Sequence, residues 1–417
     1  MTWQEAFAPL RNSNFAWYFA SRAADTLGTM MSGVALAFAV LQITDSATAL
    51  GQVLAAHTIP LIIFLLYGGV LADRFPRTLV LQLSNLLAAA SQGTLAFLVI
   101  TDQAELWMFL VLAAVNGTAD AANFPAMAGM VPQLVPRDQL QPANALLSLM
   151  RGSLTILGPS LSATLVVTVG PGWGLAVNAM TWLLSTLLLV RVVVPPKPPK
   201  IDQTSTLQDL RDGWSFFLAT TWLWVIVLAF AFLNAIHVGA WFTLGPAHAK
   251  DTIGEQGWGF VLSAESAGLL VMTLVLLRVR LGRPLLLGML GFSLVGIPQI
   301  IFGAQPELWL LVVLAFVAGA GVEVFSMGWN LAMQENIDDD MLSRAYSYDA
   351  LGSFVAMPVG QLLFGPLGDA FGFEAVLVVS GVAMIAVSLA TLLSRSVRTL
   401  DRPAGASDLR PSGAPPH

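Results

Sequence analysis

The sequence is built from long apolar runs that short polar turns separate. Hydrophobic residues make up 56% of the 417 positions and charged residues only 11%, whereas charged residues make up about 25% of a typical soluble domain. A helix needs roughly 20 mostly apolar residues to cross the hydrocarbon core of a bilayer, and many of the runs reach that length. The sequence therefore predicts an all-α protein that crosses a membrane many times.

Twelve runs meet this length criterion, and the longest polar stretch between them divides them into two groups of six. We expect an N-terminal six-helix bundle over 1–194, a cytoplasmic linker over 195–220, and a C-terminal six-helix bundle over 221–394. The tail, 395–417, is rich in Pro, Gly, Ala and Ser and is expected to be disordered. The expected spans are 14–43, 48–72, 79–100, 106–131, 143–169, 173–194, 221–247, 256–277, 285–304, 307–333, 343–371 and 374–394.

Lysine and arginine are distributed unevenly between the turns. If both termini are cytoplasmic, the odd-numbered turns carry only Lys250. The even-numbered turns carry Arg74, Arg77, Arg137, Arg191, Lys197, Lys200, Arg211, Arg278, Arg280, Arg283 and Arg344. This asymmetry follows the positive-inside rule. It predicts a multi-pass protein of the cell (inner or plasma) membrane with both termini in the cytoplasm.

Several function classes have no support in the sequence. The chain has no cysteine, and its net charge is -6, which gives no basis for nucleic-acid binding. No Walker sequence is present, so ATP-driven transport is not expected. No metal-ligand spacing or catalytic constellation stands out, so we expect neither an enzyme nor a bound metal or other cofactor.

One polar turn carries a recognisable motif. The run 69–78, GVLADRFPRT, follows the second predicted span, and it resembles the signature loop G-x-x-x-D-R/K-x-G-R-R/K of the major facilitator superfamily. Gly69, Asp73, Arg74 and Arg77 are in register with that pattern, while Pro76 and Thr78 depart from it. In the family this loop takes part in the conformational switch.

The fifth predicted span carries a second motif. Gly152, Gly158 and Pro159 resemble the antiporter motif G-x-x-x-G-P-x-x-G-G of the family's drug and metabolite exporters, with Ser162 and Ala163 in place of the final glycines. An ordinary proline-kinked helix is the alternative. Further similarity in the N-terminal half points to the bacterial branch with siderophore exporters and macrolide or drug efflux pumps; it lies in Pro125-Ala126, 132–136, Gln139-Leu140, 143–146 and Asn178-Ala179.

This resemblance implies two pseudo-symmetric six-helix bundles that work by alternating access. It also implies a monomeric secondary transporter, which we expect to export small amphipathic molecules such as drugs or siderophore-like metabolites in exchange for protons. A proton-coupled importer or symporter on the same fold is one alternative. A non-transporting membrane sensor is another, although the short loops offer it no soluble output domain.

Charges within spans are costly and indicate either a partner or a function. Arg22 and Asp25 lie three residues apart, so they share one helix face and can neutralise each other. Counted along their spans, Asp120 and Arg151 reach similar depths, and Asp120 stands in the fourth span, where the arginine-bearing motif of many drug-proton antiporters is missing. The four predict a polar network that rearranges or takes up a proton during transport, or else a purely structural one.

The C-terminal half offers different candidates for proton coupling. Glu323 lies near the middle of the tenth span with no basic residue at a similar depth, and burial favours the protonated form of such a carboxyl group. It is therefore a candidate proton carrier, with a neutral hydrogen-bonded acid as the alternative. Glu265 and His237 are lesser candidates, and His57 is interpreted as a helix-contact histidine. Asp25, Asp120, Glu323 and Glu265 form the set of proton-coupling candidates.

Spans one, four, seven and ten line the central cavity of the resembled fold. In this chain they offer aromatic and amide side chains that suit a bulky, partly apolar guest. The cavity candidates are Tyr18, Asn123, Phe124, Asn234, Trp241, Trp329 and Asn330.

Overall fold

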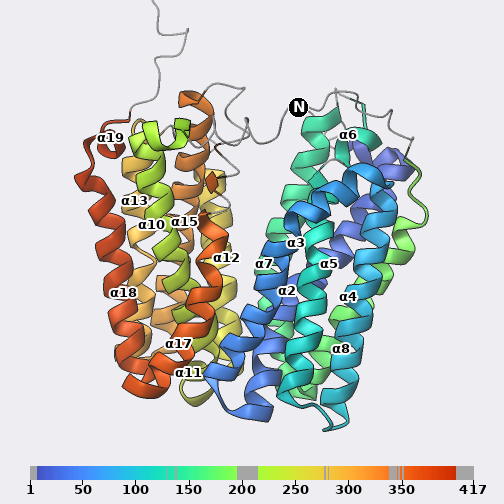
Figure 1. Ribbon diagram of the computed structural model, residues 1–417, viewed down its shortest axis with the longest axis horizontal. Coiled ribbons are helices and arrows are strands. Elements are labelled where there is room, and N and C mark those ends of the chain that lie inside the picture. Colours follow the sequence, from blue (N-terminus) through green and yellow to red (C-terminus); the bar gives the residue numbers. More distant parts are fainter. Residues whose placement is uncertain are drawn as a thin grey trace, which may run out of the picture.

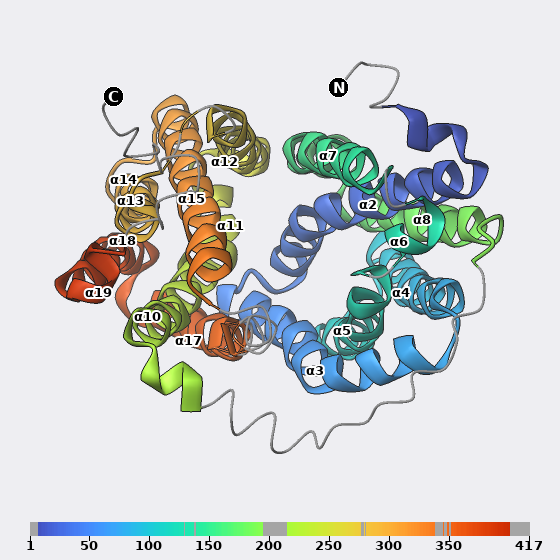
Figure 2. The same cartoon turned by 90° about the horizontal axis from the view of Figure 1, so that it is seen from above.

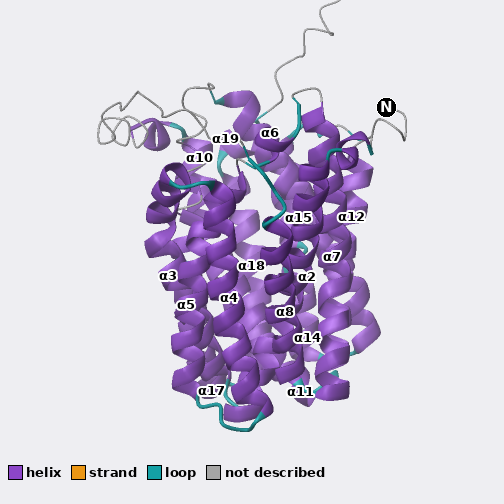
Figure 3. Ribbon diagram, turned by 90° about the vertical axis from the view of Figure 1, so that its right-hand side faces the viewer, coloured by secondary structure: helices purple, strands orange, loops and turns teal. Residues whose placement is uncertain are grey.

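The computed structural model describes residues 7–128, 130–136, 139–194, 215–276, 279, 281–337, 345, 348–349 and 352–400. The side chains of 65–74, 124–125, 128, 132, 140–141, 145 and 334 lie outside this description. The described part of the chain is helical throughout and contains no strand, as Figure 3 shows. The linker residues 195–214 and the tail residues 401–417 are outside the described part, so the predictions made for them stay predictions.

The described helices form two bundles that stand side by side (Figure 1). The first contains η1 (Ala8–Arg11), α2 (Ser13–Thr44), α3 (Ala47–Arg74), α4 (Arg77–Ile100), α5 (Leu106–Ala128), α6 (Val131–Leu134), α7 (Leu140–Val169) and α8 (Pro171–Leu189). The second contains α10 (Thr221–His237), η3 (Val238–Leu244), α11 (Gly245–Asp251), α12 (Gly254–Leu276), α13 (Pro284–Ser293), α14 (Gly296–Ala304), α15 (Leu308–Asn336), α17 (Met357–Phe371), α18 (Phe373–Ala390), η4 (Thr391–Leu393) and α19 (Arg395–Arg398).

Eleven helical segments in the described part of the chain are long and apolar enough to cross a membrane. The remaining predicted span corresponds to α5, which is 23 residues long and carries the polar residues Asn116, Asp120 and Asn123. Together these helices confirm the expected all-α membrane fold with two bundles. The domain boundaries at 194 and 221 stay predictions.

Some span boundaries differ from those expected. The ninth span consists of two helices, because α13 ends before Leu294 and α14 begins at Gly296. Pro298 explains the break, since it has no N–H to donate to the carbonyl of Leu294. The seventh span runs further than expected, from α10 through the π-helical segment η3 and α11 to Asp251.

Connections between helices at one end of the molecule are very short. Only two residues join α2 to α3, and the first of them, Asp45, has a left-handed backbone (φ 48°). Gly372 alone joins α17 to α18, also with positive φ (82°). These connections and the α11–α12 connection lie at the end of the molecule where the bundles converge, opposite the described chain termini (Figure 1). We call it the converging end.

The bundles meet along two pairs of helices, α3 with α17 and α7 with α12 (Figure 2). In the α3–α17 pair the Gln361 amide donates to the Thr58 hydroxyl at 3.0 Å. In the α7–α12 pair the Ser160 and Ser263 hydroxyls lie 2.8 Å apart. At the converging end, the Lys250 ammonium lies 2.6 Å from an Asp45 carboxylate oxygen. Polar contacts therefore join the bundles on both sides of the space between them.

Candidate functional site

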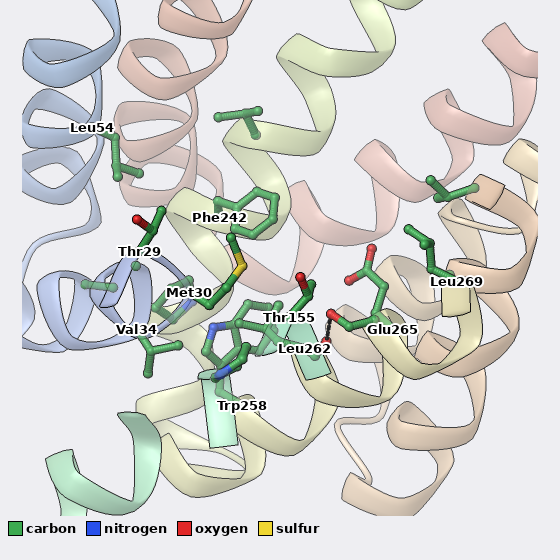
Figure 4. Close-up of a pocket in the computed structure, with 18 of the residues that line it drawn as sticks. Thr29, Met30, Val34, Leu54, Thr155, Phe242, Trp258, Leu262, Glu265 and Leu269 are labelled. Atoms are coloured by element: carbon green, nitrogen blue, oxygen red, sulfur yellow. Dashed lines mark hydrogen bonds between the residues drawn. The ribbon is translucent and has the colours of Figure 1, made fainter. Parts of the chain in front are cut away.

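A cavity of about 480 Å3 lies between the two bundles (Figure 4). We call it the central cavity. Its walls are mostly apolar, and they come from α2, α3 and α7 on one side and from η3, α11, α12, α15 and α17 on the other. The main side chains around it are Thr29, Met30, Val34, Leu54, Thr155, Phe242, Trp258, Leu262, Glu265 and Leu269.

Glu265 of α12 is the ionisable residue among the described residues that line the central cavity. The indole N–H of Trp241 donates a hydrogen bond of 3.0 Å to its carboxyl group. Trp241 lies on η3 and is only 2% exposed, with its ring packed against those of Trp258 and Phe302. The π-helical turn and the aromatic cluster therefore fix the donor that holds the Glu265 carboxyl group at the cavity wall.

A second cavity of about 210 Å3 lies within the N-terminal bundle. We call it the side cavity. It shares Thr29, Gly33 and Leu54 with the central cavity, so the two spaces are adjacent. The imidazole Nε2 of His57 on α3 lies 3.0 Å from the Asp120 carboxylate on α5. Both side chains line the side cavity and keep about a third of their surface exposed.

The contact between His57 and Asp120 depends on the close approach of α3 and α5. A Cβ atom at Gly117 would lie only 1.9 Å from the backbone oxygen of His57, so only glycine fits there. Asp120 follows Gly117 by about one helical turn and therefore projects from the same face of α5. Gly117 thus allows α3 and α5 to approach closely enough for the His57 imidazole to contact the Asp120 carboxylate.

A third cavity, of about 300 Å3, is lined by Tyr18, Arg22 and Arg151 among others. The Arg22 guanidinium forms an ion pair with Asp25, as their spacing on one helix face suggests. Asp25 is buried, with 6% of its surface exposed. The pair therefore neutralises two charges within the bundle.

The four residues of the predicted network divide between these cavities. Arg22 contacts Asp25, and Asp120 instead contacts His57, which sequence reasoning had interpreted as a helix-contact histidine. Arg151 lines the third cavity together with Arg22. A role of these residues in coupling stays a prediction. The His57–Asp120 contact was missed because it depends on how α3 and α5 pack, which the spacing along one helix does not reveal.

The carboxyl groups of the C-terminal bundle differ in position. Glu323 of α15 is half-buried. It is not among the residues that line the central cavity, whereas its neighbours Gly319 and Val322 are. Of the two predicted glutamates, Glu265 is thus the one at the wall between the bundles.

Residues 4–412 match the model of a family described as transmembrane secretion effector, one of the major facilitator families. The chain belongs to the major facilitator superfamily. It is a membrane transporter and not an enzyme, and transporters of this superfamily bind small molecules within the membrane.

Known members of the superfamily match over nearly the full length of the chain. Macrolide efflux protein A of Streptococcus pyogenes is 21% identical over 401 residues, which cover 93% of this chain and 97% of the relative. Multidrug efflux pump Tap of Mycobacterium tuberculosis is 25% identical over 420 residues, covering 97% and 100%. A solved inward-facing, unoccupied bacterial homologue of the human lysosomal transporter Spinster shares the fold, with a TM-score of 0.70, 12% identity and coverage of 97% and 100%.

The major facilitator signature loop lies at the junction of α3 and α4. The backbones of Gly69, Asp73 and Arg74 belong to the last turns of α3, and Arg77 begins α4. The side chains of the first three residues lie outside the described part of the structure. Their role as a conformational switch therefore stays a prediction.

The antiporter-like motif lies where α7 meets its neighbours. A Cβ atom at Gly158 would lie 2.5 Å from the Cβ of Met30 on α2, and one at Gly152 would contact Leu270 of the other bundle at 3.1 Å. Pro159 lines the central cavity. The motif thus packs against α2 of its own bundle at Gly158 and against the other bundle at Gly152, and its contribution to exchange stays a prediction.

The predicted cavity residues have varied positions. Trp241 holds Glu265, Tyr18 lines the third cavity, and Phe124 has a side chain outside the described part. The other four are not among the residues that line the three cavities. Three of them donate hydrogen bonds to neighbouring groups: Asn123 to Asn85, Trp329 to Asp349 and Asn330 to the Ser326 carbonyl. The fourth, Asn234, is half-buried. Sequence reasoning missed Leu54, Trp258, Leu262 and Gln361, because it searched only spans one, four, seven and ten.

Proposed function

We propose that this protein exports small amphipathic molecules from the cell in exchange for protons. The observation that carries the proposal is the mostly apolar central cavity, on whose wall Glu265 supplies the carboxyl group among the described residues. Apolar and aromatic walls suit a partly apolar guest. A carboxyl group within the membrane can bind a proton while the cavity opens to one side and release it once the cavity opens to the other. The efflux functions named for the two sequence relatives support the outward direction.

The proposal includes an orientation in the membrane. With both termini cytoplasmic, the converging end faces outward, and the described conformation is closed on the outside by contacts such as Lys250–Asp45. Export then requires these contacts to break while the opposite ends of the bundles approach each other. The positive-inside distribution of lysine and arginine supports this orientation.

The test is transport by the full-length protein in proteoliposomes with an imposed pH gradient. Each compound of a panel of lipophilic cations, macrolides and siderophores is assayed for transport driven by the proton gradient. A pH-sensitive dye records the movement of protons. We expect at least one compound to move opposite to the protons in the wild type. Glu265→Gln should reduce substrate-dependent proton movement at least tenfold, because the amide cannot carry a proton.

Three further variants locate the coupling group. Glu105→Gln alters an exposed carboxyl group in the α4–α5 connection and serves as the matched control. Glu323→Gln and Asp25→Asn test two of the other candidates for proton coupling, and loss of coupling in one of them alone would move the role away from Glu265. Movement of substrate and proton in the same direction would instead establish the importer alternative and refute export.

A further inference from the structure

Arg151 carries a positive charge that no group in the described part of the chain neutralises. It stands on α7, about 16 Å along the helix from its start at Leu140. Its guanidinium forms no ion pair and no hydrogen bond with any residue that the structure describes. An unpaired charge at this depth in a membrane-spanning helix is costly, so Arg151 favours the approach of an anion.

The third cavity, which Arg151 lines, has an excess of positive charge. Arg22 lines it as well, and the Arg22 guanidinium is already paired with Asp25. No carboxyl group is among the described residues that line this cavity. Because the charges of Arg22 and Asp25 cancel, the charge of Arg151 is left for a ligand.

Hydroxyl groups add uncharged donors to the same cavity. Tyr18 of α2 and Ser148 of α7 both line it. Neither hydroxyl forms a hydrogen bond with another residue in the described ranges of the chain. A guanidinium together with hydroxyl donors is the set of groups that binds the oxygens of a carboxylate or phosphate. The third cavity therefore has the chemistry of an anion site.

The third cavity lies next to the central cavity. On α2, Thr26 lines the third cavity and Met30 the central one; on the neighbouring α7, Arg151 lines the third cavity and Thr155 the central one (Figure 2). Four residues on a helix correspond to about one turn and about 6 Å of rise. Both helices begin opposite the converging end, so the third cavity lies on the cytoplasmic side of the central cavity in the proposed orientation.

We propose that the third cavity binds the acidic group of the transported molecule while its apolar body lies in the central cavity. This inference rests on the proposed function, because it names the chemical class of the substrate: amphipathic anions with a carboxylate or phosphate about 6 Å from the apolar body. The planar guanidinium of Arg151 donates two parallel hydrogen bonds to two oxygens of such a group.

The same anionic chemistry could come from a phospholipid headgroup instead. The contact of the third cavity with the central cavity along both α2 and α7 favours the transported molecule. A mostly apolar cavity of about 480 Å3 holds a compact aromatic body of the size of a small drug. The experiment therefore needs one arm for a soluble acid and one for an anionic lipid.

The first arm compares indomethacin, an aromatic carboxylic acid, with its primary amide, which has the same body without the charge. The full-length protein is placed in nanodiscs of phosphatidylcholine, a lipid with no net charge. Binding of radiolabelled indomethacin is measured at pH 7 with empty nanodiscs subtracted, and the amide is measured as a competitor. We expect the wild type to bind the acid about tenfold more tightly than the amide.

Variants of Arg151 locate the preference. Arg151→Gln should weaken binding of the acid about tenfold and leave binding of the amide unchanged. Arg151→Lys keeps the charge without the planar fork and should keep part of the preference. Arg398→Gln makes the same change at an exposed arginine of α19 and is the matched control. Thermal unfolding checks the fold, and Arg151→Gln should be as stable as the wild type because no described group loses a partner.

The second arm tests the lipid. Wild type and Arg151→Gln are released from nanodiscs that contain phosphatidylglycerol, and native mass spectrometry counts the phosphatidylglycerol molecules that each retains. We expect equal retention. An additional lipid that only the wild type retains would assign the site to a headgroup and overturn the inference. Equal affinities of the wild type for acid and amide, or a preference for the acid that persists in Arg151→Gln, would also overturn it.

The result is distinguishable from a failure of the proposed function. If the preference for the acid depends on Arg151 while proteoliposomes move no substrate against protons, the anion site stands and the export proposal fails. If proteoliposomes export compounds in exchange for protons while acid and amide bind equally, the export proposal stands and the anion site fails.

Discussion

The Lys250 ammonium lies 2.6 Å from the Asp45 carboxylate and connects α11 of one bundle to the α2–α3 connection of the other. The carboxylate is 84% exposed, so water screens the attraction, and such pairs are worth about 0–1 kcal/mol. That is enough to shift a balanced equilibrium between two conformations by up to about fivefold, but too little to hold one of them alone.

The first prediction concerns this ion pair. Asp45→Lys should shift the population away from the described conformation by about twofold to fivefold, because it places like charges together. The charge swap Asp45→Lys with Lys250→Asp should restore most of the original population. The chain has no cysteine, so spin labels can be attached at pairs of introduced cysteines and the distances across the converging end measured. A swap that behaves like the single variant would contradict a direct pairing.

The second prediction concerns the donor to Glu265. Trp241→Phe keeps an aromatic ring in the cluster and removes the indole N–H, so the Glu265 carboxyl group loses its 3.0 Å hydrogen bond. We expect substrate-dependent transport in proteoliposomes to fall by about threefold to tenfold, in line with about 1 kcal/mol for a hydrogen bond. Phe302→Leu alters the same cluster at a residue that is not among those lining the central cavity, and it is the control for packing. Equal losses in both variants would assign the effect to packing.

The third prediction separates a structural from a functional role of Asp25. Asp25→Asn leaves the Arg22 charge buried without its partner and should destabilise the protein by about 3 kcal/mol. The double variant Arg22→Met with Asp25→Leu removes both charges and should recover most of that stability, as thermal unfolding in detergent would record. If Asp25 also carries protons, transport stays low in the stable double variant, whereas recovery of transport would mark the pair as structural.

The fourth prediction concerns the approach of α3 to α5. Gly117→Ala places a methyl group 1.9 Å from the backbone oxygen of His57, so the helices must separate. We expect a loss of about 1–3 kcal/mol in stability. A Cβ atom at Gly33 would have nothing within 4 Å. Gly33→Ala should therefore keep or slightly raise the stability, since alanine is a better helix former than glycine. Thermal unfolding of the two variants gives the comparison.

The helices could be predicted from the sequence because their length is set by the thickness of the bilayer, which does not depend on how they pack. The Arg22–Asp25 pair was also predictable, since both residues lie on one helix. Glu323 was favoured over Glu265 because it lies near the middle of its span, whereas Glu265 is the one that lines the central cavity. What separates the two is which face of α12 or α15 turns toward the other bundle. That rotation is set by tertiary packing and, around Trp241, by the π-helical geometry of η3.

The His57–Asp120 contact shows the same limit. It joins residues 63 positions apart and requires a glycine on a different helix turn to admit the backbone of α3. Neither the charge pattern nor the apolar periodicity reports such an approach. Only the placement of the two helices identifies the imidazole as the partner of the carboxylate.

Two residues connect α2 to α3, and a single glycine connects α17 to α18. Such short connections leave the two helices of each pair little freedom to move independently. A tilt of α2 must therefore be passed on to α3 at once, and from there to α17 and α18 through the Thr58–Gln361 hydrogen bond. The helices at the converging end thus move together, so a ligand that displaces α2 in the cavities will also displace helices of the opposite bundle.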